Sequence, residues 1–345
     1  MKAVFIQEHG GPEVLTSGEL PEPMVRDGLV KVRVKAGSLN RLDVYTRTGV
    51  RGMRREFPPP LVLGGDCAGE VAEVGGGVQG LGAGDRVVVN PNITCGDCAR
   101  CLAGEDDLCP AIQMLGSALD GSYAEYVVVP AANVHPIADH VSYEDAAAVP
   151  TTFLPMWNML VRRGGLKPWE TVLVLSASAG VGAAAIQVAK NVIGARVIAT
   201  TSTADKAARA RETGADEVIN YTEEDITKRA RELTGGAGVD MVVDHVGAEF
   251  FAAAYSALRP GGRYGNCGVT TGYKYDLHMG AMFTRHLSVF GVFMGTKEDM
   301  RQIVEMVNRG KVHSTIHRTF PLENAADAHR AMEERNFFGK LLLVQ

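Results

Sequence analysis

Four cysteines that lie close together in the chain are the residues best suited to chemistry. They follow the spacing C-x2-C-x2-C-x7-C, and the 345 residues contain six cysteines in all; the four are Cys95, Cys98, Cys101 and Cys109. Four thiolates complete a tetrahedral zinc shell and leave no position for a substrate, so the spacing predicts one structural Zn²⁺. Two disulfides, or four independent buried thiols, are the alternatives. Zinc is favoured because most of the cysteines are concentrated in one short segment.

A turn of small residues indicates a dinucleotide-binding site. It reads Ala177-Ser178-Ala179-Gly180-Val181-Gly182 and lies between an expected strand at 171–176 and an expected helix at 180–192. Small residues let the backbone approach a pyrophosphate, whose charge the helix N-terminus then stabilises. The turn is a degenerate form of G-x-G-x-x-G, so its place between strand and helix carries the prediction. A tight turn that binds nothing is the alternative.

The end of the following strand distinguishes between the two nicotinamide dinucleotides. NAD sites carry an acidic residue there, which binds the ribose 2′-hydroxyl. This chain instead reads Thr200-Thr201-Ser202-Thr203, with Lys206 and Arg209 in the next helix. A missing carboxylate removes repulsion of a 2′-phosphate, and a nearby lysine attracts it. The sequence therefore favours NADPH (NADP) as the cofactor, with solvated helix charges as the other interpretation of the two basic residues.

Composition narrows the range of partners. The formal net charge is −5 with a pI near 6.0 and no block of basic residues, which argues against nucleic acid as a partner. No run of about 18 apolar residues exists to span a membrane, and the apolar start of the chain is too short for a signal peptide. We therefore expect a cytoplasmic protein that acts on a small molecule.

Two periodicities divide the chain into domains. The first 130 residues read as short strands separated by glycine and proline, which is typical of an antiparallel, barrel-like unit. From residue 171 strands and helices alternate, as in a doubly wound sheet; the expected strands are 171–176, 196–200, 217–220, 240–244, 263–266 and 287–290. A last strand at 339–344 returns to the first unit. The predicted α/β protein thus has a domain of 1–152 completed by 294–345, and a dinucleotide-binding domain of 153–293.

Further segments resemble a known family. These are Ser38-Leu-Asn40-Arg-Leu-Asp43-Val-Tyr45, Asp216 to Tyr221, Asp244-His-Val-Gly247 and Gly265 to Gly268. Together with the cysteine lobe and the small-residue turn, they are similar to the medium-chain dehydrogenase/reductases, in the branch of quinone oxidoreductases with a structural zinc lobe. The resemblance covers essentially the whole chain. It implies a GroES-like β-barrel, a Rossmann domain, a homodimer or homotetramer, and further cofactor contacts from Thr151, Tyr221, Asn266, Cys267 and Gly268.

The departures from the zinc alcohol dehydrogenases of this family are informative. Those enzymes hold a catalytic zinc with a cysteine, a histidine and a third cysteine or aspartate. The matching positions here are Asn40, Gly65 and Thr151, and Leu42 replaces the hydroxyl residue that relays the alcohol proton. An amide, a glycine and a hydroxyl do not supply the deprotonated ligands that zinc needs. The catalytic zinc is therefore predicted to be lost.

Hydride transfer without a metal suits a quinone or an α,β-unsaturated carbonyl, because hydrogen bonds can hold the anion that forms. Tyr45 and Asn40 are the expected donors to that oxyanion, and a packing role is the alternative for Tyr45. Asp66 is expected to be the sole carboxylate nearby and to orient Asn40 or a water. Three arginines within 51–55 could meet an anionic substrate such as an acyl-CoA, although a solvated loop is the simpler interpretation.

Two other functions remain open from the sequence. One is a zinc-dependent alcohol dehydrogenase with atypical ligands, for which Asp66 is the obvious candidate. The other is an NADP(H)-binding protein with little turnover. Metal content would distinguish the zinc-dependent alcohol dehydrogenase from a metal-free reductase. Consumption of NADPH would distinguish an active reductase from the binding protein with little turnover.

Overall fold

The computed structural model describes residues 1–345, which form two compact units. Unit 1 comprises residues 1–151 and 296–345, and unit 2 comprises residues 152–295. No helix in either unit is both long enough and apolar enough to cross a membrane. The fold is the predicted combination of a GroES-like, largely antiparallel unit with a Rossmann-type parallel sheet.

Unit 1 is built on a seven-stranded sheet in the order β10-β6-β5-β3-β18-β17, with β9 also paired to β3, and on a three-stranded sheet in the order β2-β1-β4. Its strands are β1 (Lys2–Ile6), β2 (Thr16–Glu19), β3 (Leu29–Ser38), β4 (Leu61–Val62), β5 (Asp66–Val74), β6 (Arg86–Val89), β7 (Asn92–Ile93), β8 (Gln113–Met114), β9 (Tyr126–Pro130), β10 (Val134–Pro136), β17 (Ile316–Pro321) and β18 (Lys340–Val344). Alternate valines of β3 are buried, as a strand with one face on a core requires.

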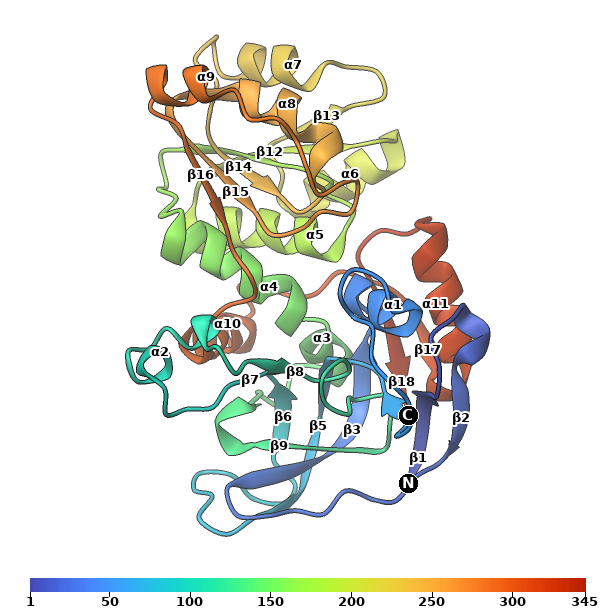
Figure 1. Cartoon of the computed structure of the whole chain (residues 1–345). Helices are drawn as coiled ribbons and strands as arrows, with labels where there is room; N and C mark the ends of the chain where they lie inside the picture. The colour runs from blue at the N-terminus through green and yellow to red at the C-terminus, as the bar shows by residue number, and fades with distance from the viewer. The chain divides into compact units, whose positions relative to one another are not determined.

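The helices of unit 1 are α1 (Arg41–Thr48), α2 (Ala99–Leu102), α3 (Tyr143–Ala147), α10 (Lys297–Asn308) and α11 (Ala325–Glu334), with short 3-10 turns at Pro12–Val14, Asp106–Leu108, Ala131–Asn133 and Leu322–Asn324. Several of them pack against its strands, as α11 does against β18. α4 (Pro150–Trp157) begins at the end of this unit and continues into unit 2. The C-terminal strand β18 pairs antiparallel with β3, so the end of the chain lies beside its beginning (Figure 1).

One helix of unit 1 shows how its sequence sets its bounds. α1 follows β3 directly and begins at a reciprocal pair of hydrogen bonds: the Asp43 N–H donates to the Asn40 carbonyl oxygen at 3.1 Å, and the Asp43 carboxylate accepts from the Asn40 N–H. It ends at Gly49, which has a φ of 69°. The cap fixes Asn40 and Asp43 at the point where β3 ends.

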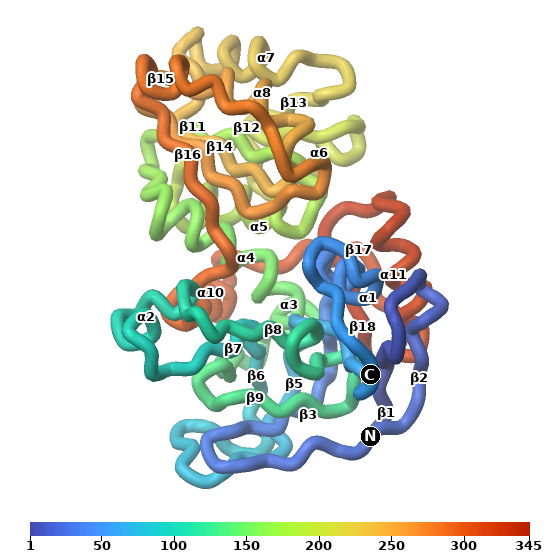
Figure 2. The backbone as a smooth tube through the Cα atoms, in the orientation of Figure 1, coloured from blue at the N-terminus to red at the C-terminus, as the bar shows by residue number.

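Unit 2 is a six-stranded parallel sheet in the order β13-β12-β11-β14-β15-β16. Its strands are β11 (Thr171–Val174), β12 (Arg196–Thr201), β13 (Glu217–Asn220), β14 (Val239–Asp244), β15 (Leu258–Asn266) and β16 (Ser288–Gly291). The strand order reverses between β11 and β14, which is the topological switch point of a Rossmann fold. Figure 2 traces β15 and β16 running beside β14 on one side of that point.

Helices connect the strands of unit 2. They are α5 (Gly180–Gln187), α6 (Ala204–Thr213), α7 (Ile226–Leu233), α8 (Ala248–Ala257) and α9 (Met279–Thr284). The single helix expected at 180–192 is α5 followed by a π-helical segment, Val188–Ile193, which ends at Gly194 with a φ of 85°. A second π-helical segment, Asn158–Arg163, continues α4.

Candidate functional site

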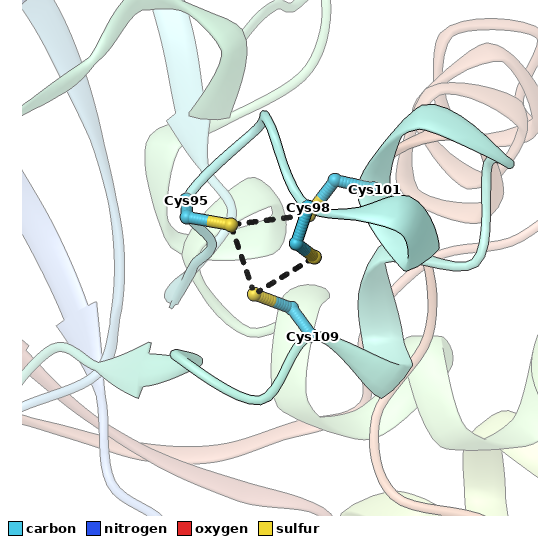
Figure 3. A group of neighbouring side chains, drawn as sticks. All are labelled: Cys95, Cys98, Cys101 and Cys109. Atoms are coloured by element: carbon cyan, nitrogen blue, oxygen red, sulfur yellow. Dashed lines mark hydrogen bonds between the residues drawn. The ribbon is translucent and has the colours of Figure 1, made fainter.

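The four cysteines converge on one point of unit 1 (Figure 3). All four Sγ atoms lie within 4.8 Å of one another, and all six cysteines of the chain are free thiols. The Sγ separations are 3.5 Å from Cys95 to Cys109, 3.8 Å from Cys95 to Cys101 and 3.9 Å from Cys98 to Cys109. A tetrahedron with Zn–S bonds of about 2.3 Å has sulfur–sulfur edges of about 3.8 Å. The geometry therefore fits a four-thiolate zinc site.

Backbone N–H groups support the sulfurs of this cluster. Hydrogen bonds from the Cys95 and Ala111 N–H groups lower the pKa of Cys109, while burial and the neighbouring thiols raise the pKa of Cys101 to about 11. Arg100 does not take part in this support, because its guanidinium pairs with Glu105 at 2.5 Å. Backbone dipoles thus hold the thiolates in place.

A second group of polar residues in unit 1 surrounds the carboxylate of Asp66, which is fully buried at the start of β5. One oxygen accepts from the Thr151 hydroxyl at 2.6 Å and from the Thr151 N–H at 3.2 Å. The other accepts from Asn40 Nδ2 at 2.8 Å and from Ser38 Oγ at 3.1 Å. Asp66 thus brings together Asn40 and Thr151, two of the three positions at which the resemblance to zinc alcohol dehydrogenases implied metal ligands.

The amide of Asn40 is fully used by the protein. Its Nδ2 donates to Asp66 and, at 3.4 Å, to the Ser38 carbonyl. Its Oδ1 accepts from Lys340 Nζ at 2.6 Å, and the same ammonium donates to the Leu39 carbonyl at 2.6 Å. Both amide hydrogens therefore have acceptors within the protein, and this geometry leaves none for a substrate oxygen.

Asp66 is not the sole carboxylate here, contrary to the expectation from the sequence. Asp43 is 2% exposed in the first turn of α1 and accepts from the Asn40 N–H at 2.7 Å. Burial, with a contribution from Asp66, raises the pKa of Asp43 to about 7. Burial also lowers the pKa of Lys340, against the pull of the two carboxylates. Two buried carboxyl groups thus share one buried ammonium.

Tyr45 and Gly65 complete the candidate site in unit 1. Tyr45 is half-buried on α1, and the Arg51 guanidinium lies 4.4 Å from the centre of its ring. Gly65 is buried, and a Cβ there would meet Leu115 and Pro91 only at ordinary contact distances of 3.4 Å and 3.6 Å. Leu42 is half-buried on the same helix as Tyr45.

The expected cofactor turn in unit 2 is shaped for a close backbone approach. It follows β11 and leads into α5, whose N-cap is Ala179. A Cβ on Gly182 would lie 2.2 Å from the carbonyl oxygen of Ser176, so only glycine fits there. Ser176 itself has a φ of 53° and donates its N–H to Thr200 Oγ1 at 3.0 Å. The turn of Ser178, Gly180 and Val181 is therefore held close to the sheet edge, as a pyrophosphate site requires.

The end of β12 carries the residues expected at the adenosine ribose. Thr201 is 1% exposed, and its Oγ1 is buried without a partner. Ser202 is half-buried, and Lys206, also half-buried, lies in the first turn of α6. Tyr221 follows β13 and packs edge-on against Phe250, with ring centres 4.9 Å apart. The half-buried Ser202 and Lys206 supply a hydroxyl and an ammonium, which are the kinds of donor that a ribose or its phosphate needs.

The end of β15 holds the remaining expected cofactor residues. Asn266 donates to the buried carboxylate of Asp244 at 2.9 Å and to the Gly268 carbonyl at 2.9 Å. Burial raises the pKa of the Cys267 thiol, so this cysteine is held in its neutral form. A Cβ on Gly268 would lie 2.4 Å from the His245 carbonyl oxygen. This group lies in unit 2, whereas Thr151, also expected at the cofactor, lies in unit 1 with Asp66.

Sequence reasoning missed Asp43 and Lys340 as members of the Asp66 group. The spacing Asn40-x-x-Asp43 before a helix is a capping-box signal, so the position of Asp43 could have been found. Lys340 gave no such signal, because a lysine at the start of a C-terminal strand is ordinarily exposed.

The chain matches two adjoining family descriptions. Residues 26–139 match the alcohol dehydrogenase GroES-like domain, and residues 180–309 match zinc-binding dehydrogenase. The chain is 32% identical to the NAD-dependent alcohol dehydrogenase of Saccharolobus solfataricus over the whole of both proteins. It is 32% identical to quinone oxidoreductase 1 of Escherichia coli, covering 99% of this chain and 98% of that protein.

Two further comparisons extend the range of relatives. The chain is 30% identical to the acryloyl-coenzyme A reductase of Metallosphaera sedula over all of both proteins. A crystal structure of an NAD-dependent alcohol dehydrogenase is 47% identical, with a TM-score of 0.96 over the whole of both chains. The relatives thus share the fold and differ in the substrates and reactions that their names give.

Proposed function

The chain belongs to the medium-chain dehydrogenase/reductase family and is an oxidoreductase of that family, and on this premise we propose that it reduces a quinone or an α,β-unsaturated carbonyl with NADPH and without a catalytic metal. The observation that carries the proposal is the use of Asn40 and Thr151 as donors to Asp66. Where the related alcohol dehydrogenases hold zinc, this chain has two donors to a carboxylate and a glycine, Gly65. These groups do not fit a catalytic Zn²⁺, which needs three lone-pair donors.

The chemistry assigned to unit 1 is stabilisation of negative charge. NADPH, when bound, supplies a hydride to the electrophilic carbon, and charge then develops on the substrate oxygen. Tyr45 donates a hydrogen bond to that oxygen, because its phenol is a half-buried donor on α1. The Arg51 guanidinium over the Tyr45 ring adds positive charge nearby. Asn40 and Asp66 act as positioning residues that fix the start of α1, which carries Tyr45.

NADPH is proposed over NADH, although several relatives are named NAD-dependent. The support is the end of β12, where Thr201 and Ser202 stand in place of an acidic residue and Lys206 lies in the first turn of α6. A neutral strand end accepts a 2′-phosphate, and a lysine ammonium attracts it.

One zinc is proposed at Cys95, Cys98, Cys101 and Cys109, supported by the sulfur spacing. Its role is structural, because four thiolates leave no open coordination position. A homodimer or homotetramer is also proposed. It is supported by β16, an edge strand that leaves Val289 42% exposed and is followed by Phe293 at 58% exposed.

Two alternative functions, a zinc alcohol dehydrogenase and a binding protein with little turnover, are tested by the assays of NADPH oxidation given below. A zinc alcohol dehydrogenase with Asp66 as a ligand would have to break the four hydrogen bonds that this carboxylate accepts. A binding protein with little turnover would hold NADPH without consuming it. NADPH oxidation measured with a quinone, an enone, an enal and an enoyl-CoA tests the proposal directly. Rapid oxidation with one of them supports it, whereas oxidation of simple alcohols alone would overturn it.

A further inference from the structure

A cavity of about 420 Å³ opens in unit 1 at the C-terminal end of α1, the helix that carries Tyr45. Its lining comes from the turn after β1, the end of α1 and the loop that follows α1. These segments contribute Glu8 and His9, Thr48, and Arg54, Arg55 and Phe57, respectively. Sites for small molecules commonly have volumes of about 300–1,000 Å³. The cavity is therefore large enough to hold part of a substrate.

Positive charge outweighs negative charge in the lining of this cavity. Arg54 is exposed and Arg55 is half-buried, and they are opposed by one carboxylate, that of the exposed Glu8. The excess is local, because the whole chain has a formal net charge of −5. A guanidinium is flat and donates paired hydrogen bonds to the oxygens of a carboxylate, a sulfonate or a phosphate. The cavity therefore favours an oxyanion.

The loop that carries the two arginines is tied to α1 through His9. The His9 Nε2 accepts from the Arg55 N–H at 3.0 Å, and Nδ1 donates to the Thr46 carbonyl at 3.1 Å. The His9 ring also packs edge-on against Phe57, with ring centres 5.2 Å apart. The Arg55 guanidinium lies 5.4 Å from the centre of the Phe57 ring. The cavity wall is thus held in place before a ligand binds, which reduces the cost of binding.

The cavity is continuous with the surroundings of Tyr45. Thr48 lies three residues after Tyr45, so the two half-buried side chains share one face of α1 and stand about 5–6 Å apart at their Cβ atoms. The loop begins against Tyr45, because the Val50 N–H donates to the Tyr45 carbonyl at 3.2 Å and the Arg51 guanidinium lies over its ring. A substrate with its reacting oxygen at Tyr45 can therefore extend a second polar group into the cavity.

We propose that the substrate carries, besides its electrophilic carbonyl or quinone, a carboxylate or a phosphate that Arg54 and Arg55 bind in this cavity. The inference rests on the proposed reductase function and adds the charge of the substrate to it. The bound oxyanion is remote from the reacting atoms, so its contacts are the same before and during hydride transfer. Such contacts lower KM and leave kcat nearly unchanged.

The test compares matched neutral and anionic substrates in the full-length, metal-loaded protein. Benzylideneacetone is paired with its 4-carboxylate, and crotonyl-pantetheine with crotonyl-coenzyme A, which adds phosphates. 1,4-Naphthoquinone is paired with its 2-sulfonate and serves for a protein that reduces only quinones. The readout is the anion preference, which is kcat/KM for the anionic member divided by kcat/KM for the neutral member. The pair with the larger effect identifies a carboxylate or a phosphate as the natural oxyanion.

Arg54→Gln combined with Arg55→Gln should lower the anion preference about tenfold for at least one pair, chiefly through KM, because charge-assisted contacts are lost. Arg54→Lys keeps the charge and should retain part of the preference. Glu8→Gln removes the opposing carboxylate and should raise the preference about twofold, since single exposed charges contribute little. The opposite directions of the arginine and glutamate variants separate an effect of charge from a disturbed loop.

Arg318→Gln is the matched control. Arg318 lies on β17 of unit 1, is exposed and, like Arg55, stands over a phenylalanine ring, with its guanidinium 4.4 Å from the centre of Phe320. It does not line the cavity, so its loss should leave the anion preference unchanged.

Two results would overturn the inference while leaving the proposed function intact. One is a double arginine variant that keeps the anion preference of the parent for every pair that the protein reduces. The other is an equal fall in Arg318→Gln, which would show that only the overall charge matters. A parent protein that oxidises NADPH with none of the six substrates would instead overturn the proposed function, and the inference with it.

Discussion

Lys340 donates a hydrogen bond of 2.6 Å to the side-chain oxygen of Asn40, although the two residues lie 300 positions apart in the chain. The contact joins the start of β18 to the residue before α1. It fixes which way the Asn40 amide faces, because the oxygen points to the ammonium and the nitrogen to Asp66. The last strand of the chain thus orients a residue at a position where the resemblance to zinc alcohol dehydrogenases implied a metal ligand.

Removal of the ammonium should destabilise unit 1 strongly. Lys340→Met leaves Asp43 and Asp66 buried without a cation, and loss of one partner from a buried charge group typically costs about 3–5 kcal/mol. Urea unfolding of parent and variant measures the change in the free energy of unfolding. Lys2→Met is the control, because Lys2 is exposed and its loss should have little effect. Equal stability of Lys340→Met and the parent would show that the ammonium contributes nothing.

Asp43 should make stability depend on pH. Its pKa is about 7 in the folded protein against 3.8 for an ordinary aspartate, so the folded state keeps a proton that the unfolded chain has released. The contribution of this group to stability is complete below about pH 4 and is lost as the pH rises to about 7. Asp43→Asn cannot ionise and keeps a side-chain oxygen to accept from the Asn40 N–H.

The measurement is the melting temperature of parent and Asp43→Asn from pH 4 to pH 8. The difference, variant minus parent, should grow by a few degrees up to about pH 7 and then level off. Asp66 and Lys340 face Asp43 and are present in both proteins, so their own titration largely cancels. Two parallel profiles would contradict a raised pKa at Asp43.

An acidic residue at the end of β12 should reverse the cofactor preference. Thr201→Asp supplies a carboxylate that can bind a ribose 2′-hydroxyl and that repels a 2′-phosphate. Loss of one charge-assisted contact is worth about 1.5–3 kcal/mol, or about ten- to a hundredfold in the NADPH Kd. Because Thr201 is 1% exposed, Ser202→Asp at the neighbouring half-buried position is a second variant. The preference for NADPH is refuted if the parent binds NADPH and NADH equally.

Tyr45→Phe should slow reduction while leaving the fold intact. The change removes only the hydroxyl and keeps the ring of this half-buried residue. Loss of one oxyanion donor typically costs about 10²–10³ in rate. Single-turnover NADPH oxidation measures the chemical step, with NADPH affinity measured separately. A rate within about threefold of the parent would leave Tyr45 a packing residue.

Features of the fold that depend on residues close together in the chain were predicted from the sequence. The alternating valines of β3 and the small-residue turn before α5 depend on residues close in the chain, and both were found where expected. The group around Asp66 depends instead on chain segments that meet only in the fold. Lys340 and Asp43 therefore escaped prediction, and Asn40, expected to donate to substrate, proved to have both amide hydrogens in use.

The zinc content of the active protein tests the central claim most directly. The Asp66 carboxylate accepts hydrogen bonds from the Asn40 amide and the Thr151 hydroxyl, so these side chains are already paired with one another. Only the four-cysteine cluster therefore has the donors for a metal. Metal analysis of a preparation that oxidises NADPH with a quinone or an enal should give one zinc per chain. Two zinc ions per chain, with the second lost together with activity on mild chelation, would contradict metal-free hydride transfer.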